Sequence, residues 1–211
     1  MLEPPRLELL VATRNSGKVQ EIKLALRDLP LRLRFLDEFS ELSAVDESGK
    51  TYEENAIIKA RSYSKQTGLC ALADDSGLEV DAFGGAPGVW SARYGGNVVS
   101  DEERIARLLS ELSRSQGRER QARFICVMAI ADSRVIHVAE GSCEGRIAEA
   151  PRGENGFGFD PIFIPENYES TFAELPLHTK NKISHRAQAL ARTRHFLSHW
   201  LGELDRRLAA S

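Results

Sequence analysis

The alternation of apolar runs with helical patterns over the first part of the chain constrains the fold more than any other feature. Apolar runs typical of strands occur at Leu7–Ala12, around Leu31–Leu36 and at Leu69–Ala73. Helical periodicity separates them, at Lys18–Leu29 and Thr51–Thr67. Strands that alternate with helices are typical of the α/β class. We therefore predict an α/β fold.

The second half of the chain continues this pattern. Two apolar runs, Phe124–Ala131 and Val135–Glu140, are joined by Asp132-Ser133-Arg134 and predict a hairpin. Helical patterns lie at Glu102–Leu112 and Ser184–Leu208. The chain has 211 residues, which suits one domain or two lobes that share a sheet.

Composition excludes several classes of partner. The net charge of −3 gives no general attraction to nucleic acid or to an anionic membrane. The basic segment Ser113–Arg123 lacks interleaved aromatic residues and is interpreted as a solvated loop. No apolar run approaches the roughly 20 residues that span a bilayer, and Met1–Arg6 lacks the features of a signal peptide. We expect a cytoplasmic protein without nucleic-acid or membrane partners.

The cysteines give no sign of a redox or metal site. Cys70, Cys126 and Cys143 are odd in number, have no C-x-x-C spacing, and lie in or beside apolar segments. We interpret them as buried, reduced thiols.

The first candidate site is the loop after the first predicted strand, LLVATRNSGKVQE at Leu9–Glu21. It departs from a Walker A loop, because Ala12 stands where glycine is required and Val19 stands where serine or threonine is required. A helix beginning near Gly17 still directs free N–H groups and a positive dipole end at the loop, and Lys18 adds a charge. An ordinary capped turn explains the loop equally well.

A second candidate is the pair Asp74-Asp75, where a buried strand is predicted to give way to a glycine-rich loop. Adjacent residues in an extended chain point in opposite directions, so only one easily reaches a given metal ion. The other would orient backbone or a neighbouring group. An Asx turn is the alternative.

The helix predicted from Thr51 carries a third candidate. Glu54 has the spacing of a capping box with Thr51, which is a purely structural use. Asn55 and Lys59 share one helix face, and a carboxylate beside an amide and an ammonium also suits a metal and phosphate site. The sequence alone leaves both alternatives open.

The fourth candidate is the glycine-rich aromatic segment PRGENGFGFDPIFIP, Pro151–Pro165. Glycines alternate with Phe157 and Phe159 and end at Asp160, which suits close backbone approach to a flat ring such as a nucleobase. An aromatic-anchored surface loop before a strand is the alternative.

A fifth candidate is a group of basic residues, placed before or within the first turn of the last predicted helix. They are Lys180, Lys182, His185 and Arg186. Cations oppose the helix dipole at that end, which suggests a polar or anionic ligand. By contrast, the run from Ser100 has a capping-box spacing, so Asp101 and Glu102 are assigned to a helix N-terminus and to no chemistry.

Together these features resemble the inosine triphosphate pyrophosphatase family, which hydrolyses non-standard purine nucleoside triphosphates. TRNSGK fits the family's T/S-x-N-x-x-K loop, and four further motifs follow in the family's order: EENAIIKA, ADDSGLEVDAFGGAPGVWSARYGG, FGFDPIF and KNKISHRAQAL. The resemblance extends from Leu9 to about Leu190.

The resemblance implies roles for individual residues. It implies Mg²⁺ binding by Glu54 and Asp75, with Asp75 also the proton acceptor for the attacking water. It implies that the substrate is bound by Thr13, Arg14, Asn15, Ser16, Gly17, Lys18, Ser76, Phe157, Gly158, Phe159, Asp160, Lys180, His185 and Arg186. Phe159 departs from the family, in which tyrosine or tryptophan is frequent at this position.

The resemblance also implies an overall fold and a reaction. The expected fold is an elongated mixed central β-sheet with helices, forming a single domain over residues 1–211 whose two lobes flank an active-site cleft, usually in a homodimer. The expected reaction is Mg²⁺-dependent hydrolysis of ITP, dITP or XTP to a nucleoside monophosphate and pyrophosphate, which removes these nucleotides before they enter DNA and RNA. Two alternatives are a pyrophosphatase for modified pyrimidine nucleotides and a nucleotide-binding regulator without catalysis.

Overall fold

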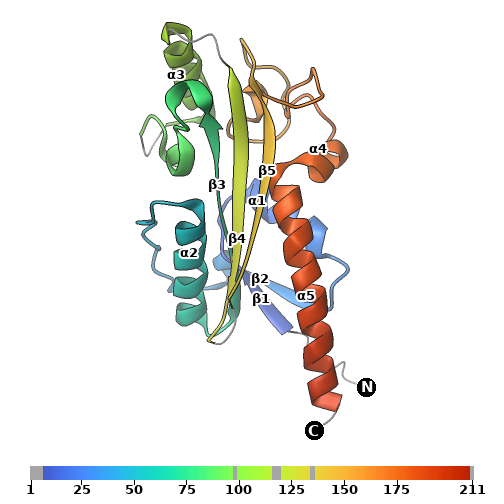
Figure 1. Cartoon of the computed structure of the whole chain (residues 1–211). Coiled ribbons are helices and arrows are strands. Elements are labelled where there is room, and N and C mark those ends of the chain that lie inside the picture. The colour runs from blue at the N-terminus through green and yellow to red at the C-terminus, as the bar shows by residue number, and fades with distance from the viewer. Residues whose placement is uncertain (1–6, 97–98, 116–119, 134–135, 210–211) are drawn as a thin grey trace. The chain divides into compact units, whose positions relative to one another are not determined.

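A mixed six-stranded sheet forms the framework of the computed structural model, which describes residues 7–96, 99–115, 120–133 and 136–209 (Figure 1). The strands are β1 (Leu7–Val11), β2 (Leu31–Phe35), β3 (Cys70–Val80), β4 (Gln121–Ala131), β5 (Ile136–Ile147) and β6 (Phe163–Pro165), in the order β2-β1-β3-β4-β5-β6. β1 pairs in parallel with β2 and β3, whereas β5 and β6 are antiparallel. The predicted α/β class with a mixed sheet is confirmed.

Three of the helices begin at side-chain caps that the sequence supplies locally. The helices are α1 (Ser16–Leu26), α2 (Tyr52–Thr67), α3 (Asp101–Arg114), α4 (Leu177–Ile183) and α5 (His185–Ala209), with short 3₁₀ turns at Leu36–Glu38, Asp81–Phe83, Gly88–Arg93 and Asp160–Ile162. Asn15, Thr51 and Ser100 accept hydrogen bonds from backbone N–H groups in the first turns of α1, α2 and α3. Each cap satisfies a donor that the helix itself leaves unpaired.

The chain divides into two compact units. Within the described residues, unit 1 is drawn from Met1–Asp75, Val127–Glu140 and Ala189–Ser211, and unit 2 from Ser76–Cys126 and Gly141–Gln188. β3, β4, β5 and α5 each contribute residues to both units.

In unit 1, helices cover both faces of the sheet. Asp74 and Asp75 are successive residues of β3 and therefore point to opposite faces. Asp75 contacts α2, whereas Asp74 contacts α1. Arg194 of α5 donates to the carbonyl oxygen of Ala25 in α1, so α1 and α5 share the face opposite α2, in agreement with Figure 1.

The register between β1 and β3 positions the loop that follows β1. Val11 pairs with Leu72, and the N–H of Ala12 donates to the carbonyl oxygen of Leu72 at 2.8 Å. The chain therefore leaves β1 beside the stretch of β3 that contains Asp74 and Asp75.

Unit 2 has a hydrophobic core of its own, built by β3–β6, α3 and the segments between β5 and α4. Its buried members are Leu78, Val80, Ile105, Leu108, Leu112, Ala122, Phe124, Cys143, Ile147, Phe159, Ile162, Phe163, Phe172 and Leu175. Phe124 and Phe163 pack with ring centroids 4.7 Å apart, and Phe163 and Phe172 at 5.1 Å. Aromatic rings in such contact stabilise the core, because they bury apolar surface and pack in favourable edge-on or offset arrangements.

The prediction of a glycine-rich loop directly after Ala73 is wrong. β3 continues through Asp74 and Asp75 to Val80, and both aspartates as well as Leu78 and Val80 are buried. Sheet pairing and burial on both faces outweigh the turn preference of Asp, Ser and Gly.

The four basic residues lie before or within the first turn of the last helix, α5, as predicted, but two of them do not oppose a helix dipole. Lys180 and Lys182 lie in the last turn of a separate helix, α4, where cations suit the helix dipole. His185 and Arg186 lie at the start of α5 as predicted.

The remaining predictions for the fold concern β4, β5 and the cysteines. β4 and β5 are neighbours, and the N–H of Ile147 at the end of β5 donates to the carbonyl oxygen of Arg120 just before β4, so the strands are antiparallel as in the predicted hairpin. Arg134 in the predicted turn, Val135, residues 116–119 of the basic segment and Met1–Arg6 lie outside the described residues. The three cysteines are buried free thiols, as predicted.

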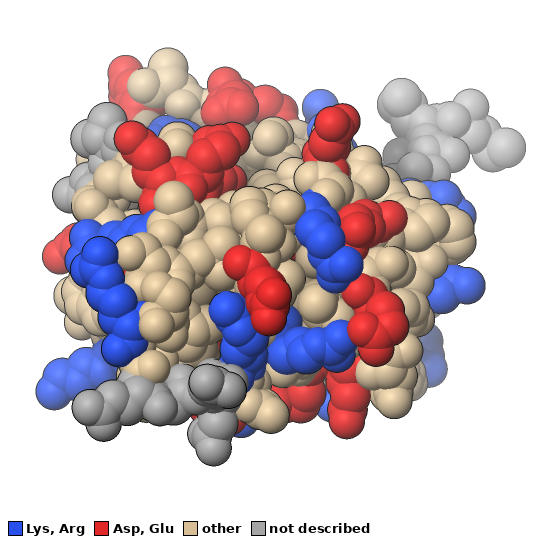
Figure 2. Space-filling model, turned by 90° about the horizontal axis from the view of Figure 1, so that it is seen from above, with Lys and Arg blue, Asp and Glu red and all other residues tan. Residues whose placement is uncertain are grey.

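Surface charges of both signs are interspersed. On the face drawn in Figure 2, Lys and Arg side chains lie among Asp and Glu side chains. Such mixing offers no broad basic surface to a polyanion on that face. Among the described residues, no helix combines the length and the apolar character needed to cross a membrane.

Candidate functional site

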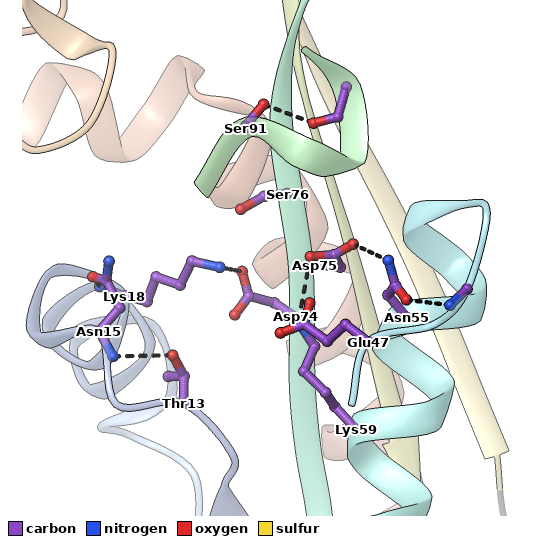
Figure 3. Close-up of polar contacts among 12 residues, drawn as sticks. Thr13, Asn15, Lys18, Glu47, Asn55, Lys59, Asp74, Asp75, Ser76 and Ser91 are labelled. Atoms are coloured by element: carbon purple, nitrogen blue, oxygen red, sulfur yellow. Dashed lines mark hydrogen bonds and ion pairs between the residues drawn. The ribbon is translucent and has the colours of Figure 1, made fainter. Parts of the chain in front are cut away.

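The loop between β1 and α1 leads into the N-terminus of α1 and faces solvent. Thr13 Oγ1 accepts a hydrogen bond from the N–H of Asn15 at 3.2 Å, and Asn15 Oδ1 accepts one from the N–H of Lys18 at 3.0 Å (Figure 3). Arg14, Asn15 and Ser16 are exposed. The N–H groups of Ser16 and Gly17 lie in the first turn of α1, at the positive end of its dipole. The loop therefore presents hydrogen-bond donors suited to an anion.

Lys18 reaches from this loop to β3. Its Nζ lies 2.8 Å from Asp74 Oδ2, and the Asp74 side chain is 1% exposed (Figure 3). The ion pair fixes the position of the ammonium group of Lys18 beside the loop. The two aspartates thus contact different partners, as the alternation of the strand predicted, and the orienting role of Asp74 stays a prediction.

Asp75 points to α2 and is held at both carboxylate oxygens. Asn55 Nδ2 donates to Oδ2 at 3.1 Å, and Lys59 Nζ donates to Oδ1 at 3.3 Å (Figure 3). Burial raises the pKa of Asp75 above its ordinary value, and this effect exceeds the lowering by Lys59, Asn55 and Lys18. A carboxylate with a raised pKa is a better proton acceptor at neutral pH.

Lys59 links Asp75 to a second carboxylate, Glu47. Lys59 Nζ donates to Glu47 Oε2 at 2.9 Å. Burial by itself would lower the pKa of Lys59, but the neighbouring carboxylates, with Asp75 foremost, outweigh burial and raise it. Lys59 is therefore a fixed positive charge between two carboxylates.

Glu47 is a residue that the sequence did not indicate. It lies in an irregular segment between β2 and α2 that has no periodic pattern. Gly49 N–H donates to Asn55 Oδ1 at 2.9 Å, and a Cβ at Gly49 would lie 2.7 Å from the same oxygen. A glycine is needed there for this close approach. In the sequence, Gly49 is the local feature that could have indicated that the segment packs against α2.

The backbone of Glu54 takes part in the N-terminal cap of α2, as the capping-box spacing suggested. Its N–H donates to Thr51 Oγ1 at 3.1 Å, and its carboxylate accepts a hydrogen bond from the N–H of Lys50 at 2.6 Å. A full capping box would instead direct the Glu54 carboxylate to the Thr51 N–H. The metal-binding role of Glu54 stays a prediction.

The polar groups of unit 1 surround a cavity of about 220 Å³. Its lining residues are Ala12, Thr13, Arg14, Lys18, Leu36, Val45, Glu47, Lys59, Tyr63 and Asp74. Cationic side chains beside carboxylates are the groups that bind a phosphate together with a divalent metal ion.

Unit 2 contains a buried carboxylate of its own, Asp160, which holds the glycine-rich aromatic loop. Asp160 Oδ2 accepts hydrogen bonds from the N–H of Phe157 at 2.9 Å and from Lys180 Nζ at 2.6 Å. Gly156 has φ +81°, and a Cβ there would collide with the Asp160 carboxylate. Gly156 is therefore required by the close approach of Asp160.

The half-buried ring of Phe157 lies close to two cations. Lys180 Nζ is 4.9 Å from the ring centroid, and Arg186 Cζ is 5.4 Å from it. Arg186 Nη2 also donates to Ser76 Oγ at 2.9 Å. Unit 2 thus brings together Ser76, Phe157, Lys180 and Arg186, four of the residues predicted to bind substrate.

Two other predicted residues are part of the core. Phe159 is 4% exposed and packs edge-on against Tyr94, with ring centroids 6.4 Å apart. His185 is 3% exposed and stacks on Phe124, with centroids 4.6 Å apart. Both side chains thus pack inside unit 2.

Comparison with known proteins identifies the family. Residues 9–196 match the model of the Ham1 family. The chain belongs to the Ham1 family. The match covers both the loop between β1 and α1 and Arg186, so it spans the candidate residues of both units.

Curated relatives of this Ham1-family chain match it over most of its length. A protein from Geobacter sulfurreducens named dITP/XTP pyrophosphatase is 48% identical over 92% of this chain and 98% of its own length. One of the same name from Bacillus licheniformis is 47% identical over 87% of this chain and 94% of its own length. The solved structure of a HAM1 protein from Coxiella burnetii is 45% identical, covers 92% of this chain and 99% of its own, and superposes with a TM-score of 0.85.

These relatives bear on two of the predictions. The family resemblance drawn from five ordered motifs is confirmed, because the curated relatives carry the name of a pyrophosphatase for non-standard purine nucleotides. The fold class is confirmed by the superposition with another Ham1-family protein.

Proposed function

We propose that this chain hydrolyses non-standard purine nucleoside triphosphates, with dITP and XTP as representatives, to a nucleoside monophosphate and pyrophosphate. The observation that carries the proposal is the buried Asp75 carboxylate, which Asn55 and Lys59 hold in place while Lys59 also lines the cavity beside the loop after β1. Relatives at 47% and 48% identity named dITP/XTP pyrophosphatase support it.

The loop from Thr13 to Lys18 is proposed to bind the triphosphate. The N–H groups at the start of α1 and the Lys18 ammonium supply donors and positive charge, both of which favour phosphate oxygens. Lys18 already pairs with Asp74, so phosphate would compete for or share its three N–H donors.

A divalent metal ion, which we propose to be Mg²⁺, fits the donor set of unit 1. Among the described residues, no cluster of three or more His, Cys, Asp or Glu side chains could bind a metal on its own. Mg²⁺ suits this arrangement because it usually binds through one or two carboxylates, water and substrate phosphates. When bound, it would neutralise charge on the phosphate oxygens.

The carboxylates proposed to hold the metal are Asp75 with Glu54 or Glu47. The family resemblance favours Glu54, whereas the contacts favour Glu47. Glu47 lines the cavity and contacts Lys59, the partner of Asp75, while the Glu54 carboxylate is bound to the Lys50 N–H.

Asp75 is proposed to accept a proton from the attacking water. The water oxygen would form a bond to the α-phosphorus, and the bond from that phosphorus to the oxygen bridging to the β-phosphorus would break. The electron pair leaves with pyrophosphate, and Lys18 and the loop N–H groups stabilise that charge. The burial that raises the pKa of Asp75 strengthens it as a base.

Base recognition is proposed for the cluster of unit 2. The half-buried Phe157 ring offers a stacking surface, and Arg186 or Lys180 offers a donor to the 6-oxo group of hypoxanthine or xanthine. Adenine presents an amino group at that position, which would leave two donors facing each other. Ser76 Oγ orients the Arg186 guanidinium through its hydrogen bond.

Further features of the family resemblance are proposed as well. The whole chain is proposed to act as one catalytic domain, in a homodimer located in the cytoplasm. Sedimentation of the purified protein tests the homodimer, and a monomer at micromolar concentration would contradict it.

The experiment that tests the function measures products from ITP, dITP, XTP, ATP and GTP, with Mg²⁺ and with EDTA. We expect pyrophosphate and monophosphate from the first three substrates, only with Mg²⁺. Release of inorganic phosphate and a diphosphate would place the cut at the γ-phosphate and contradict the mechanism. Binding of ITP without any turnover would indicate a regulator instead of an enzyme.

A further inference from the structure

Asp101 occupies the first position of α3 but is not needed to cap that helix. The capping box is complete without it, because Ser100 Oγ accepts from the Glu103 N–H and the Glu103 carboxylate accepts from the Ser100 N–H. The Asp101 carboxylate is thus available for other contacts.

Both oxygens of Asp101 accept hydrogen bonds from different directions. Oδ1 accepts from Arg104 Nη1 at 2.6 Å, within the same helix. Oδ2 accepts from the backbone N–H of Gly158 at 2.7 Å, and that residue is 57 positions away in the chain. Arg104, which is largely buried, fixes the orientation that directs Oδ2 at Gly158. A hydrogen bond to a charged acceptor is stronger than one between neutral groups.

The loop that Asp101 contacts depends on such hydrogen bonds. On one side, Asp160 holds the Phe157 N–H and Lys180. On the other side, Phe157 and Gly158 border a cavity of about 560 Å³ together with Asp101 and Ile105, so packing from that side is incomplete. Without close packing, backbone hydrogen bonds decide the conformation of a loop.

We propose that Asp101 is a positioning residue for base recognition, because it fixes the loop that directs the Phe157 ring toward Lys180 and Arg186. The inference rests on the proposed function, in which Phe157 stacks on the base. Asp101 does not contact the substrate itself. Its carboxylate holds the N–H of Gly158, and this positions the ring of Phe157, the preceding residue.

The chain provides a matched control in Glu102. Glu102 is the next residue of the same first turn, borders the same cavity, and makes no described contact with Gly158. Glu102→Gln removes one negative charge from the start of α3, as Asp101→Ala does, and so accounts for any effect of the helix dipole. Asp101→Asn retains one acceptor oxygen and should give an intermediate effect.

The first test needs no catalysis. Hydrogen exchange of a peptide covering residues 157–160, followed by mass spectrometry, should be about tenfold faster in Asp101→Ala than in the wild type. Glu102→Gln should exchange at the wild-type rate. Equal exchange in all three proteins would overturn the inference.

The second test separates the base from the phosphates by calorimetry. Asp101→Ala should raise the Kd of ITP about tenfold and leave the Kd of inorganic triphosphate within about twofold. In turnover the change should appear in KM, with kcat retained. A wild type that binds ITP but never hydrolyses it contradicts only the proposed function, and unchanged ITP affinity in Asp101→Ala contradicts only this inference.

A double-mutant cycle with Phe157→Ala asks whether Asp101 acts through the ring. Once the ring is removed, losing Asp101 should cost less than about twofold further in ITP affinity, so the two effects are not additive. Independent, additive losses would show that Asp101 acts elsewhere and would overturn the inference.

Discussion

Asp75 in unit 1 and Asp160 in unit 2 are buried aspartates that each pair with a lysine, yet these two pairs differ in the lengths of their contacts. In unit 2, Asp160 Oδ2 accepts from Lys180 at 2.6 Å and from the Phe157 N–H at 2.9 Å. In unit 1, the contacts of Asp75 are 3.1 and 3.3 Å, and its partner Lys59 borders a cavity. The short contacts hold Asp160 and Lys180 firmly together, whereas the longer contacts of Asp75 suit the proton-accepting role proposed for its carboxylate.

The largest expected effect comes from Asp75→Asn. Losing a general base lowers turnover by about 10³-fold, whereas ITP should still bind because the phosphate loop is untouched. Product release from ITP and calorimetry of ITP binding measure the two quantities. Turnover within tenfold of the wild type would remove Asp75 from the mechanism.

The same substitution should not lower stability. Burial raises the folded-state pKa of Asp75 above its unfolded value, so the group favours folding below its unfolded pKa and this contribution is lost as the pH rises through the folded pKa. At neutral pH the ionised carboxylate therefore disfavours folding, and a neutral Asn relieves that cost while Lys59 keeps the carboxylate of Glu47 as a partner. We expect urea unfolding at pH 7 to give Asp75→Asn a free energy equal to or above that of the wild type.

Asp160→Asn should show the opposite pattern. Removing the carboxylate that lies 2.6 Å from Lys180 Nζ disrupts a buried ion pair and lowers the free energy of unfolding by about 3 kcal/mol. Urea denaturation measures this loss. As a control, Asp160→Asn combined with Lys180→Met removes both charges and should recover most of the stability; a double variant less stable than the single one would contradict this explanation.

The features that could be predicted from the sequence are those decided by nearby residues. The caps at Asn15, Thr51 and Ser100 depend on hydrogen bonds three residues along the chain, and each forms as its spacing indicates. The shared face of Asn55 and Lys59 follows from helical periodicity, and both side chains contact Asp75.

The features that escaped prediction depend on tertiary pairing. Asp74 and Asp75 lie inside β3 because the sheet continues past them, although the residues that follow are typical of turns. Glu47 comes to Lys59 through an irregular segment without periodicity, and Asp101 meets Gly158 from 57 residues away. No local pattern encodes contacts of this kind.

A tenfold effect should decide which glutamate completes the metal site beside Asp75. If Glu47, which contacts Lys59, is the metal ligand, Glu47→Gln should raise the Mg²⁺ concentration for half-maximal activity by about tenfold. The reason is that a lost carboxylate ligand weakens metal affinity at least as much as a lost supporting group. Glu54→Gln should change it less than twofold. The reverse order would return the metal role to Glu54.

The smallest effect compares the caps at the start of α1 and α3. Asp is as good an N-cap as Asn or Ser, so Asn15→Asp and Ser100→Asp should each keep the free energy of unfolding within about 0.5 kcal/mol of the wild type. Only Asn15→Asp places a negative charge beside a phosphate, and it should raise the KM for ITP about fivefold, more at low salt, while Ser100→Asp leaves KM unchanged. Steady-state kinetics at two salt concentrations checks this. An unchanged KM in Asn15→Asp would leave the loop of α1 as a capped turn like that of α3, because the added charge would then have met no anion there.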